Sequence, residues 1–230
     1  MKKGYYTEEI IRKFVEALND AKKIVKAEDR PRVKISNANS KMGAVASVSQ
    51  LPFLTCPGCC ECSCAAKCYA AKLANLRPSV LKAWAYNTAL AIYRPLEYWA
   101  GVSEAVGAVK YFRFHVSGDI PNMAYFRHVV DVAREHSGTE VLMFTKRWAV
   151  VNEWIGENGP LPSNLHVMFS GWEGLQPENP YGLPETNVIL KGSEPREGWK
   201  LCGGKCETCA ARGVGCWTAT TGDVIAFNEH

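Results

Sequence analysis

Apolar residues near the start of the chain recur at helical spacing. Thr7 is placed to cap a helix, and Glu8 and Glu9 would lie at the positive end of its dipole. The apolar stripe of this helix would consist of Ile10, Ile11, Phe14, Val15, Leu18 and Val25. Residues 1–30 are therefore predicted to form an N-terminal amphipathic helix that packs against the rest of the protein.

After Arg30 the pattern changes to short, β-rich apolar runs that end in polar residues. The runs cover residues 33–35, 111–116, 141–144, 166–169, 188–190 and 224–227. Helical segments lie between them: one opens at Pro78, one opens at Asp119 or Ile120 before Pro121, and one runs from Trp148 to Ile155. Strands that alternate with helices predict a single α/β domain over residues 31–230 with parallel strands. We expect a partial or complete (β/α) barrel-like fold, with an open α/β sheet as the alternative.

Polar side chains follow the predicted strands, where α/β proteins form their sites. His115, Ser117 and Asp119 are candidate catalytic residues, His115 as a ligand, proton donor or substrate contact. A buried structural histidine and a helix-capping Asp119 are the alternatives, and capping is the favoured one for Asp119. Lys146 is a candidate for binding an anionic ligand, although a helix-start or surface role is the more common use of such a residue. The C-terminal His230 is either close to a metal site or simply exposed.

All ten cysteines lie in two short groups, within residues 56–68 and 202–216. Clustered thiols indicate either disulfides or metal binding. The N-terminus shows no signal-peptide pattern, and no apolar stretch is long enough to span a membrane. A chain of 230 residues can also bury a full core without disulfides. We therefore predict a cytoplasmic protein with two cysteine-rich metal-binding loops.

The second cysteine group favours an iron–sulfur cluster over zinc. Cys202, Cys206, Cys209 and Cys216 supply four thiolates in one small loop, as a closed 4Fe–4S cluster requires. The first three have the CxxxCxxC spacing of radical S-adenosylmethionine enzymes, although the motif comes late in the chain. Glu194 lies in a Gly-Ser-Glu-Pro segment that resembles the cofactor-binding Gly-Gly-Glu-Pro of those enzymes, with a loop turn as the alternative. Zinc held by two CxxC pairs would leave six cysteines unexplained.

Three segments together resemble the phage "gene product 88" family of cysteine-rich proteins. They are Thr55–Ala70, the strand and turn Phe112–Asp119, and the ending from Cys216 to His230. The resemblance spans about residues 35–230. It implies that Cys56, Cys64 and Cys68 are the metal ligands of the first group, and that Cys59, Cys60 and Cys62 are additions. Three thiolates would leave one iron of a second 4Fe–4S cluster open to substrate or to S-adenosylmethionine.

These observations predict an iron–sulfur protein with one or two 4Fe–4S-type clusters at the strand ends. A redox or radical-type enzyme acting on a small molecule is the leading hypothesis. The alternatives are a zinc-stabilised module that binds nucleic acid or a host protein, and a non-catalytic electron carrier or redox sensor. The net charge of +4 is modest and no basic stripe interleaved with aromatics is evident, so nucleic acid is neither indicated nor excluded. The sequence does not indicate the substrate, the nuclearity of the clusters or the oligomeric state.

Overall fold

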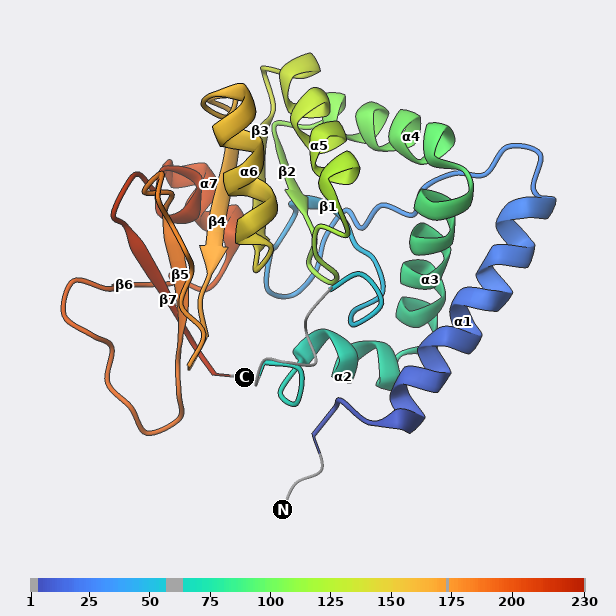
Figure 1. Ribbon diagram of the computed structural model, residues 1–230, viewed down its shortest axis with the longest axis horizontal. Helices are drawn as coiled ribbons and strands as arrows, with labels where there is room; N and C mark the ends of the chain where they lie inside the picture. Colours follow the sequence, from blue (N-terminus) through green and yellow to red (C-terminus); the bar gives the residue numbers. More distant parts are fainter. Residues whose placement is uncertain (1–3, 57–63, 173, 230) are drawn as a thin grey trace.

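The computed structural model describes residues 4–56, 64–172 and 174–229 (Figure 1). Helices precede and alternate with the strands of one sheet. In chain order the elements are α1 (Glu8–Ala27), β1 (Ala46–Val48), α2 (Tyr69–Leu76), α3 (Pro78–Tyr93), α4 (Pro95–Gly107), β2 (Tyr111–Phe114), α5 (Met123–Glu135), β3 (Glu140–Thr145), α6 (Trp148–Asn158), β4 (Leu165–Ser170), β5 (Glu185–Ile189), β6 (Lys200–Leu201), α7 (Cys206–Arg212), the 3₁₀ turn η2 (Gly215–Trp217) and β7 (Val224–Asn228). No helix among the described residues combines the length and apolarity needed to cross a membrane.

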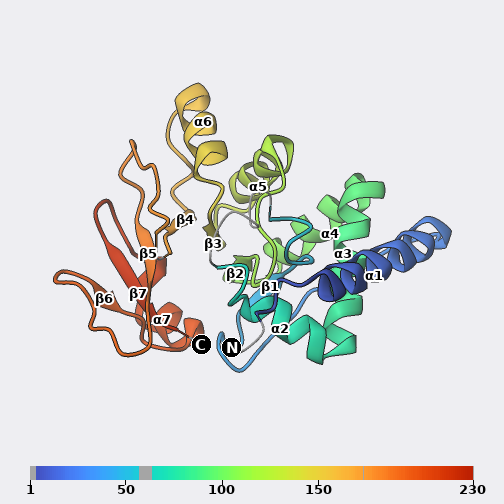
Figure 2. The same cartoon turned by 60° about the horizontal axis from the view of Figure 1, so that its bottom comes forward.

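The sheet has seven strands in the order β1-β2-β3-β4-β5-β7-β6, and every paired neighbour is parallel. The α/β class and the parallel sheet are thus confirmed, but the complete barrel is wrong because β1 and β6 remain open edges. From β1 to β5 the spatial order follows the sequence, so right-handed crossovers place their helices on one face. Figure 2 shows the strands as an open arc, with α5 and α6 outside it and α7 inside it.

Alternating side chains divide the core between the two faces of the sheet. On β3, Val141 and Met143 pack in the large core beneath the helices. Leu142, between them, packs instead with Met168 and Trp217 in a second cluster on the face that carries α7. The period of two along a strand produces this division. The inner face, which carries α7, is therefore where both an apolar floor and the second cysteine group lie.

The N-terminal helix forms as the sequence predicts. The side chain of Thr7 accepts a hydrogen bond from the backbone N–H of Ile10, which caps α1. Ile10, Phe14 and Val25 are buried, and α1 lies alongside α3 (Figure 1). Helix α3 begins with Pro78 as its first residue, as expected from the fixed φ of proline.

Two local predictions are wrong for identifiable reasons. Residues 33–35 form no strand, because the Asn87 side chain satisfies the backbone N–H and C=O of Lys34. Helix α5 begins at Met123, and Asn122 caps it by accepting from the N–H of Tyr125. Asp119 is therefore not the cap, and its carboxylate has other partners.

Candidate functional site

Both cysteine groups line one cavity of about 910 Å³ on the inner side of the sheet. The cysteines concerned are Cys56, Cys64, Cys68, Cys202, Cys206, Cys209 and Cys216. Polar residues at the carboxyl ends of β2 and β3, His115, Ser117, Asp119 and Lys146, line the same cavity. Residues far apart in the sequence therefore meet at the edge where parallel α/β sheets place their sites.

Helix α7 and the turn after it position the second cysteine group. Cys206 and Cys209 lie one helical turn apart on α7, and Cys216 lies in η2. Trp217, 4% exposed, packs beside them and donates from its indole nitrogen to the Cys206 carbonyl at 3.2 Å. Cys202 is tied to the sheet by a hydrogen bond of 2.9 Å from its N–H to the carbonyl of Ala226. The four thiols are thus held by a helix, a 3₁₀ turn and the sheet edge.

The electrostatics of this group couple its thiols to one another. Burial raises the pKa of Cys216 to about 12, with further increases from Cys202 and Cys206. Burial also raises the pKa of Cys209, with the same two neighbours adding to the shift. Negative charge on Cys209 or Cys216 is therefore costly unless a cation offsets it. Within the described residues, no three His, Cys, Asp or Glu side chains converge in a way that could hold a metal ion.

Two basic residues accompany these thiols on the inner face. An Nη1 hydrogen of Arg113 points to the Cys206 sulfur at 3.7 Å, and the guanidinium lies over the ring of Phe144. Burial lowers the pKa of Lys41, while Cys202 raises it. Sequence reasoning did not single out either residue. The signal was the alternation along β2, which turns Arg113 away from the core that buries its neighbours Phe112 and Phe114.

The first cysteine group is described only in part, because Cys59, Cys60 and Cys62 lie outside the described residues. Cys68 precedes α2, and its sulfur accepts from the N–H of Ala71 at 3.5 Å. The hydroxyl of the following residue, Tyr69, donates to the carbonyl of Val116 just after β2. The residue as a whole is 44% exposed, but burial around the hydroxyl raises its pKa, with Cys68, Cys56 and Cys206 contributing. Tyr69 thus lies close to sulfurs of both groups.

His115 occupies an unusual backbone position directly after β2. Its φ of 57° is in the left-handed region, and the residue is 3% exposed. Its Nε2 lies 3.0 Å from the hydroxyl of Tyr125, whereas Nδ1 has no hydrogen-bond partner among the described residues. Burial, and secondarily Arg113, lowers the pKa of His115 to about 3. The imidazole is therefore neutral at physiological pH.

The depressed pKa of His115 predicts a pH-dependent stability. The folded state resists protonation down to about pH 3, whereas the unfolded chain binds the proton near pH 6.5. The free energy of unfolding should therefore fall with pH below 6.5, by up to about 1.4 kcal/mol per pH unit from this residue. Urea unfolding should measure this effect. Between pH 7 and pH 4.5, the free energy of unfolding of the wild type should fall by about 2–3 kcal/mol more than that of His115→Gln.

The comparison between the two proteins cancels any effect of acid on a bound cofactor that they share. His128→Gln, on the exposed side of α5, is the matched control for loss of a histidine. A constant difference between wild type and His115→Gln across this pH range would contradict the buried, neutral imidazole.

Asp119 joins the ends of two adjacent strands. One carboxylate oxygen accepts from the N–H of Ile120 at 2.7 Å and from the hydroxyl of Thr145 at 2.6 Å, and the other accepts from the N–H of Lys146 at 2.9 Å. Burial raises the pKa of the Asp119 carboxyl, while these donors act in the opposite direction. Asp119 therefore fixes the loop after β2 to the loop after β3.

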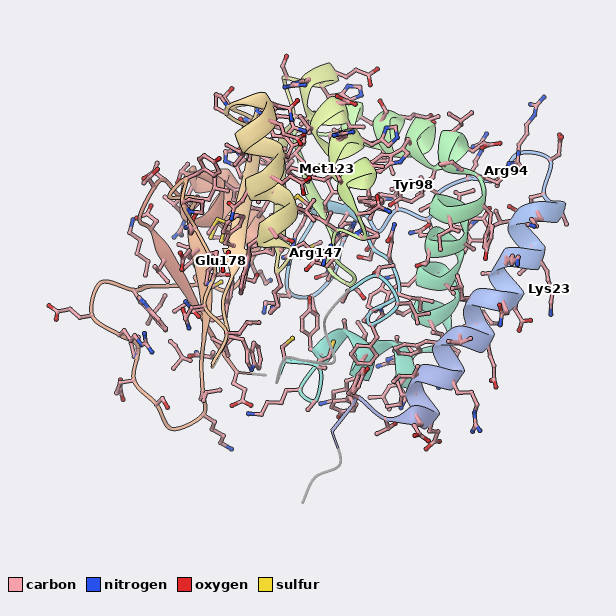
Figure 3. All side chains as sticks on the ribbon, viewed as in Figure 1. Lys23, Arg94, Tyr98, Met123, Arg147 and Glu178 are labelled. Carbon is pink, nitrogen blue, oxygen red and sulfur yellow. The ribbon has the colours of Figure 1, made fainter. Side chains whose placement is uncertain are left out.

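The remaining predicted site residues separate from one another. Lys146 lines the cavity, with its amino group 5.8 Å from the centre of the Trp172 ring. Arg147 lies at the start of α6 (labelled in Figure 3). Glu194 is exposed in the segment between β5 and β6 and does not line the cavity. His230 lies outside the described residues.

A glycine close to α7 provides a test of how the second cysteine group is held. Gly43 has a φ of +69°, and a Cβ there would lie 2.0 Å from a carboxylate oxygen of Glu207 and 2.6 Å from its Cβ. The N–H of Glu207 also donates to the carbonyl of Met42 at 2.9 Å. The loop before β1 thus packs directly against the helix that carries Cys206 and Cys209.

We expect Gly43→Ala to lower the free energy of unfolding by about 3 kcal/mol or more, because backbone strain and displacement of α7 add. Gly192 is the matched control, with a φ of +88° and nothing within 4 Å of an added Cβ. Gly192→Ala should cost only the strain, about 1 kcal/mol. Equal losses in urea unfolding would mean that the contact with Glu207 contributes nothing.

Comparison with known proteins identifies a family. The sequence matches the family described as gene product 88 over residues 13–216, which is most of the chain. No significant match to this chain was found among curated proteins or among solved structures. The matched region contains both cysteine groups and the strand and turn around His115. The chain therefore belongs to the gene product 88 family, as the three sequence segments indicated.

Proposed function

We propose that this chain is an iron–sulfur protein that uses two cysteine groups to serve one substrate cavity. Cys202, Cys206, Cys209 and Cys216 would hold a closed 4Fe–4S-type cluster. Cys56, Cys64 and Cys68 would hold a second cluster with one open iron. The observation that carries the proposal is the meeting of both groups at a single cavity of about 910 Å³.

The chemistry of the second group fits a cluster. Cys202 and Cys206 are near enough to raise the pKa of Cys209 and Cys216, so thiolates in this group need positive charge between them. An iron–sulfur cluster supplies that charge, and Arg113 beside Cys206 adds a hydrogen bond of the kind that tunes cluster potentials. Trp217 and the apolar floor of Leu142 and Met168 exclude water from the same region.

The arrangement favours a cluster over a single zinc ion. Zinc requires four ligands to converge on one centre at about 2.3 Å. A 4Fe–4S cluster instead binds each thiolate to a different iron, so the four cysteines carried by α7, η2 and the adjoining sheet edge could each bind one iron of the same cluster.

The cavity supports an enzyme rather than a simple carrier. Its volume lies in the range of sites for small molecules, and polar groups from several strand ends reach into it. A bound cluster would supply single electrons or initiate radical chemistry. The protein residues would bind the substrate, keep water out and orient it, with His115, Ser117 and Lys146 facing it from the strand ends.

Anaerobic purification followed by metal, sulfide and absorption analysis tests this proposal. We expect a brown protein with about eight irons and eight acid-labile sulfides per chain. One or two zinc ions, no sulfide and no colour would instead favour a zinc-stabilised binding module. Addition of S-adenosylmethionine should then change the electron paramagnetic resonance spectrum of the reduced protein if the open iron binds it. An unchanged spectrum would leave a substrate-binding or electron-carrying cluster.

A further inference from the structure

Four buried polar atoms of cavity-lining residues have no hydrogen-bond partner among the described residues. They are Ser47 Oγ, Arg113 Nε, His115 Nδ1 and Ser117 Oγ. All four residues line the cavity, and Ser47 and Arg113 are direct neighbours in the register of β1 and β2. Ser47, His115 and Ser117 are at most 3% exposed. Buried polar groups are nearly always paired, so this concentration indicates a ligand.

Hydrogen-bond accounting assigns His115 Nδ1 as a donor. The hydroxyls of Tyr98 and Tyr125 are 2.7 Å apart, and both accept from the amide nitrogen of Gln50 at 3.3 Å. Tyr98, labelled on α4 in Figure 3, is fully buried. With the Gln50 amide nitrogen facing both tyrosines, as here, Gln50 Oε1 has no partner among the described residues, and donation from Tyr125 to Tyr98 would leave the Tyr98 hydrogen without an acceptor.

Tyr98 therefore donates to Tyr125, and Tyr125 donates to Nε2 of His115, which lies 3.0 Å away. In this orientation of the Gln50 amide, the proton of the neutral imidazole lies on Nδ1. The lowered pKa of His115, about 3, keeps the ring neutral, so only one of its two nitrogens carries a proton.

The cavity lining complements an anion. Arg113 Nε can only donate, His115 Nδ1 donates in the assigned tautomer, and the hydroxyls of Ser47 and Ser117 can donate as well. Five described basic residues line the cavity: Lys41, Lys67, Arg113, Lys146 and Lys205. Its two described acidic residues are both engaged, Asp119 by its three donors and Glu229 by Lys67 at 2.7 Å.

We propose that Ser47, Arg113, His115 and Ser117 form an oxyanion subsite that binds a carboxylate or phosphate group of the ligand. The subsite adjoins Cys206 through Arg113, so the bound ligand would lie beside the second cysteine group. The inference depends on the proposed function only in treating this ligand as the substrate. The binding itself requires the four donors alone.

The test is titration calorimetry of the purified full chain with acetate and, separately, with inorganic phosphate, after its iron content has been measured. We expect saturable binding of one of the two anions, with a dissociation constant on the order of 1 mM. The anion that binds distinguishes a carboxylate ligand from a phosphate ligand. Failure of both anions to bind would mean that ordered water satisfies the four groups, and would overturn the subsite.

Matched variants separate anion binding by these four residues from nonspecific anion binding in the cavity. Ser117→Ala should weaken binding about 3- to 10-fold and Arg113→Gln more than about 10-fold, because the arginine contact is charge-assisted. Ser170→Ala should leave binding unchanged, because this serine lines the same cavity but its hydroxyl is paired with Thr186 at 3.3 Å. Equal affinity in Ser117→Ala and Ser170→Ala would contradict the assignment.

Nitrogen NMR of ¹⁵N-labelled histidine tests the tautomer directly, with His115→Gln identifying the signal. We expect protonated Nδ1, and a protonated Nε2 would remove one donor and overturn the site as assigned. Iron content and anion binding report independently on the two proposals. Protein without iron that still binds the anion would refute the iron–sulfur function and leave the subsite standing.

Discussion

Replacing Cys209 by serine should remove about half of the bound iron and sulfide from protein purified without oxygen. Cys209 lies one helical turn after Cys206 on α7, and both thiols line the cavity. A serine hydroxyl is a much weaker iron ligand than a thiolate, so the closed cluster should be lost and the other retained. We expect iron to fall from about eight to about four per chain, with a matching loss of visible absorption.

Thr208→Ala is the matched control, because Thr208 lies between the two cysteines on the same helix and is exposed. It should keep the full iron content. Complete loss of iron in Cys209→Ser would mean that the two groups build one shared centre. Unchanged iron would exclude Cys209 as a ligand and contradict the cluster on α7.

The same replacement at Cys68 tests the second half of the proposal. Cys68 precedes α2 and Cys202 is tied to β7 at the sheet edge, and both line the cavity. If each group holds its own cluster, the two serine variants should lose different, additive fractions of the iron. Overlapping losses would again indicate one shared centre.

The sequence predicted best those elements whose local signals agree with their packing. The stripe from Ile10 to Val25, capped by Thr7, became α1, and Pro78 opened α3. The runs after Lys110, Thr139 and Asn164 became β2, β3 and β4, because their alternate residues face two different cores. In these segments burial and hydrogen bonding require the same pattern.

The wrong predictions concern segments whose backbone hydrogen bonds or strand pairing depend on residues distant in the sequence. Val33 and Ile35 alternate as in a strand, but the side chain of Asn87 takes the hydrogen bonds that a neighbouring strand would need. The short strand β1, Ala46–Val48, has only 3 residues, too few for its alternation to be recognised in the sequence. Closure of the barrel depends on whether the last strand pairs with the first, which no local pattern encodes.

The sequence predicted which residue types line the candidate site, but it did not predict which of those residues contact one another. The spacing of the cysteines identified the two groups, and the polar strand ends identified His115, Ser117 and Asp119. The role of Arg113 depends on the register that sets it beside Ser47 and on α7 bringing Cys206 within 3.7 Å. The positive φ of His115 and its contact with Tyr125 likewise arise only in the folded chain.

Replacing Asp119 by alanine should cost more stability than any other polar substitution at the cavity. The change would leave three donors without their acceptor: the N–H groups of Ile120 and Lys146 and the hydroxyl of Thr145. Each buried unsatisfied donor costs about 1–3 kcal/mol, so we expect the free energy of unfolding to fall by about 3–5 kcal/mol. Urea unfolding of the wild type and Asp119→Ala at neutral pH measures this loss of stability.

Two further variants distinguish a structural role of Asp119 from a direct role on the substrate. Asp119→Asn keeps one oxygen for Ile120 and Thr145 but turns an NH₂ group towards the N–H of Lys146, so its loss should be intermediate. Asp131→Ala, on the exposed side of α5, should change stability little. If Asp119→Ala lowers the free energy of unfolding no more than Asp131→Ala does, the hydrogen bonds of Asp119 contribute little to stability, and its carboxylate is free to act on a ligand. If stability falls in the expected order, Asp119 holds the loops of His115 and Lys146 together, and the site depends on it through their positions.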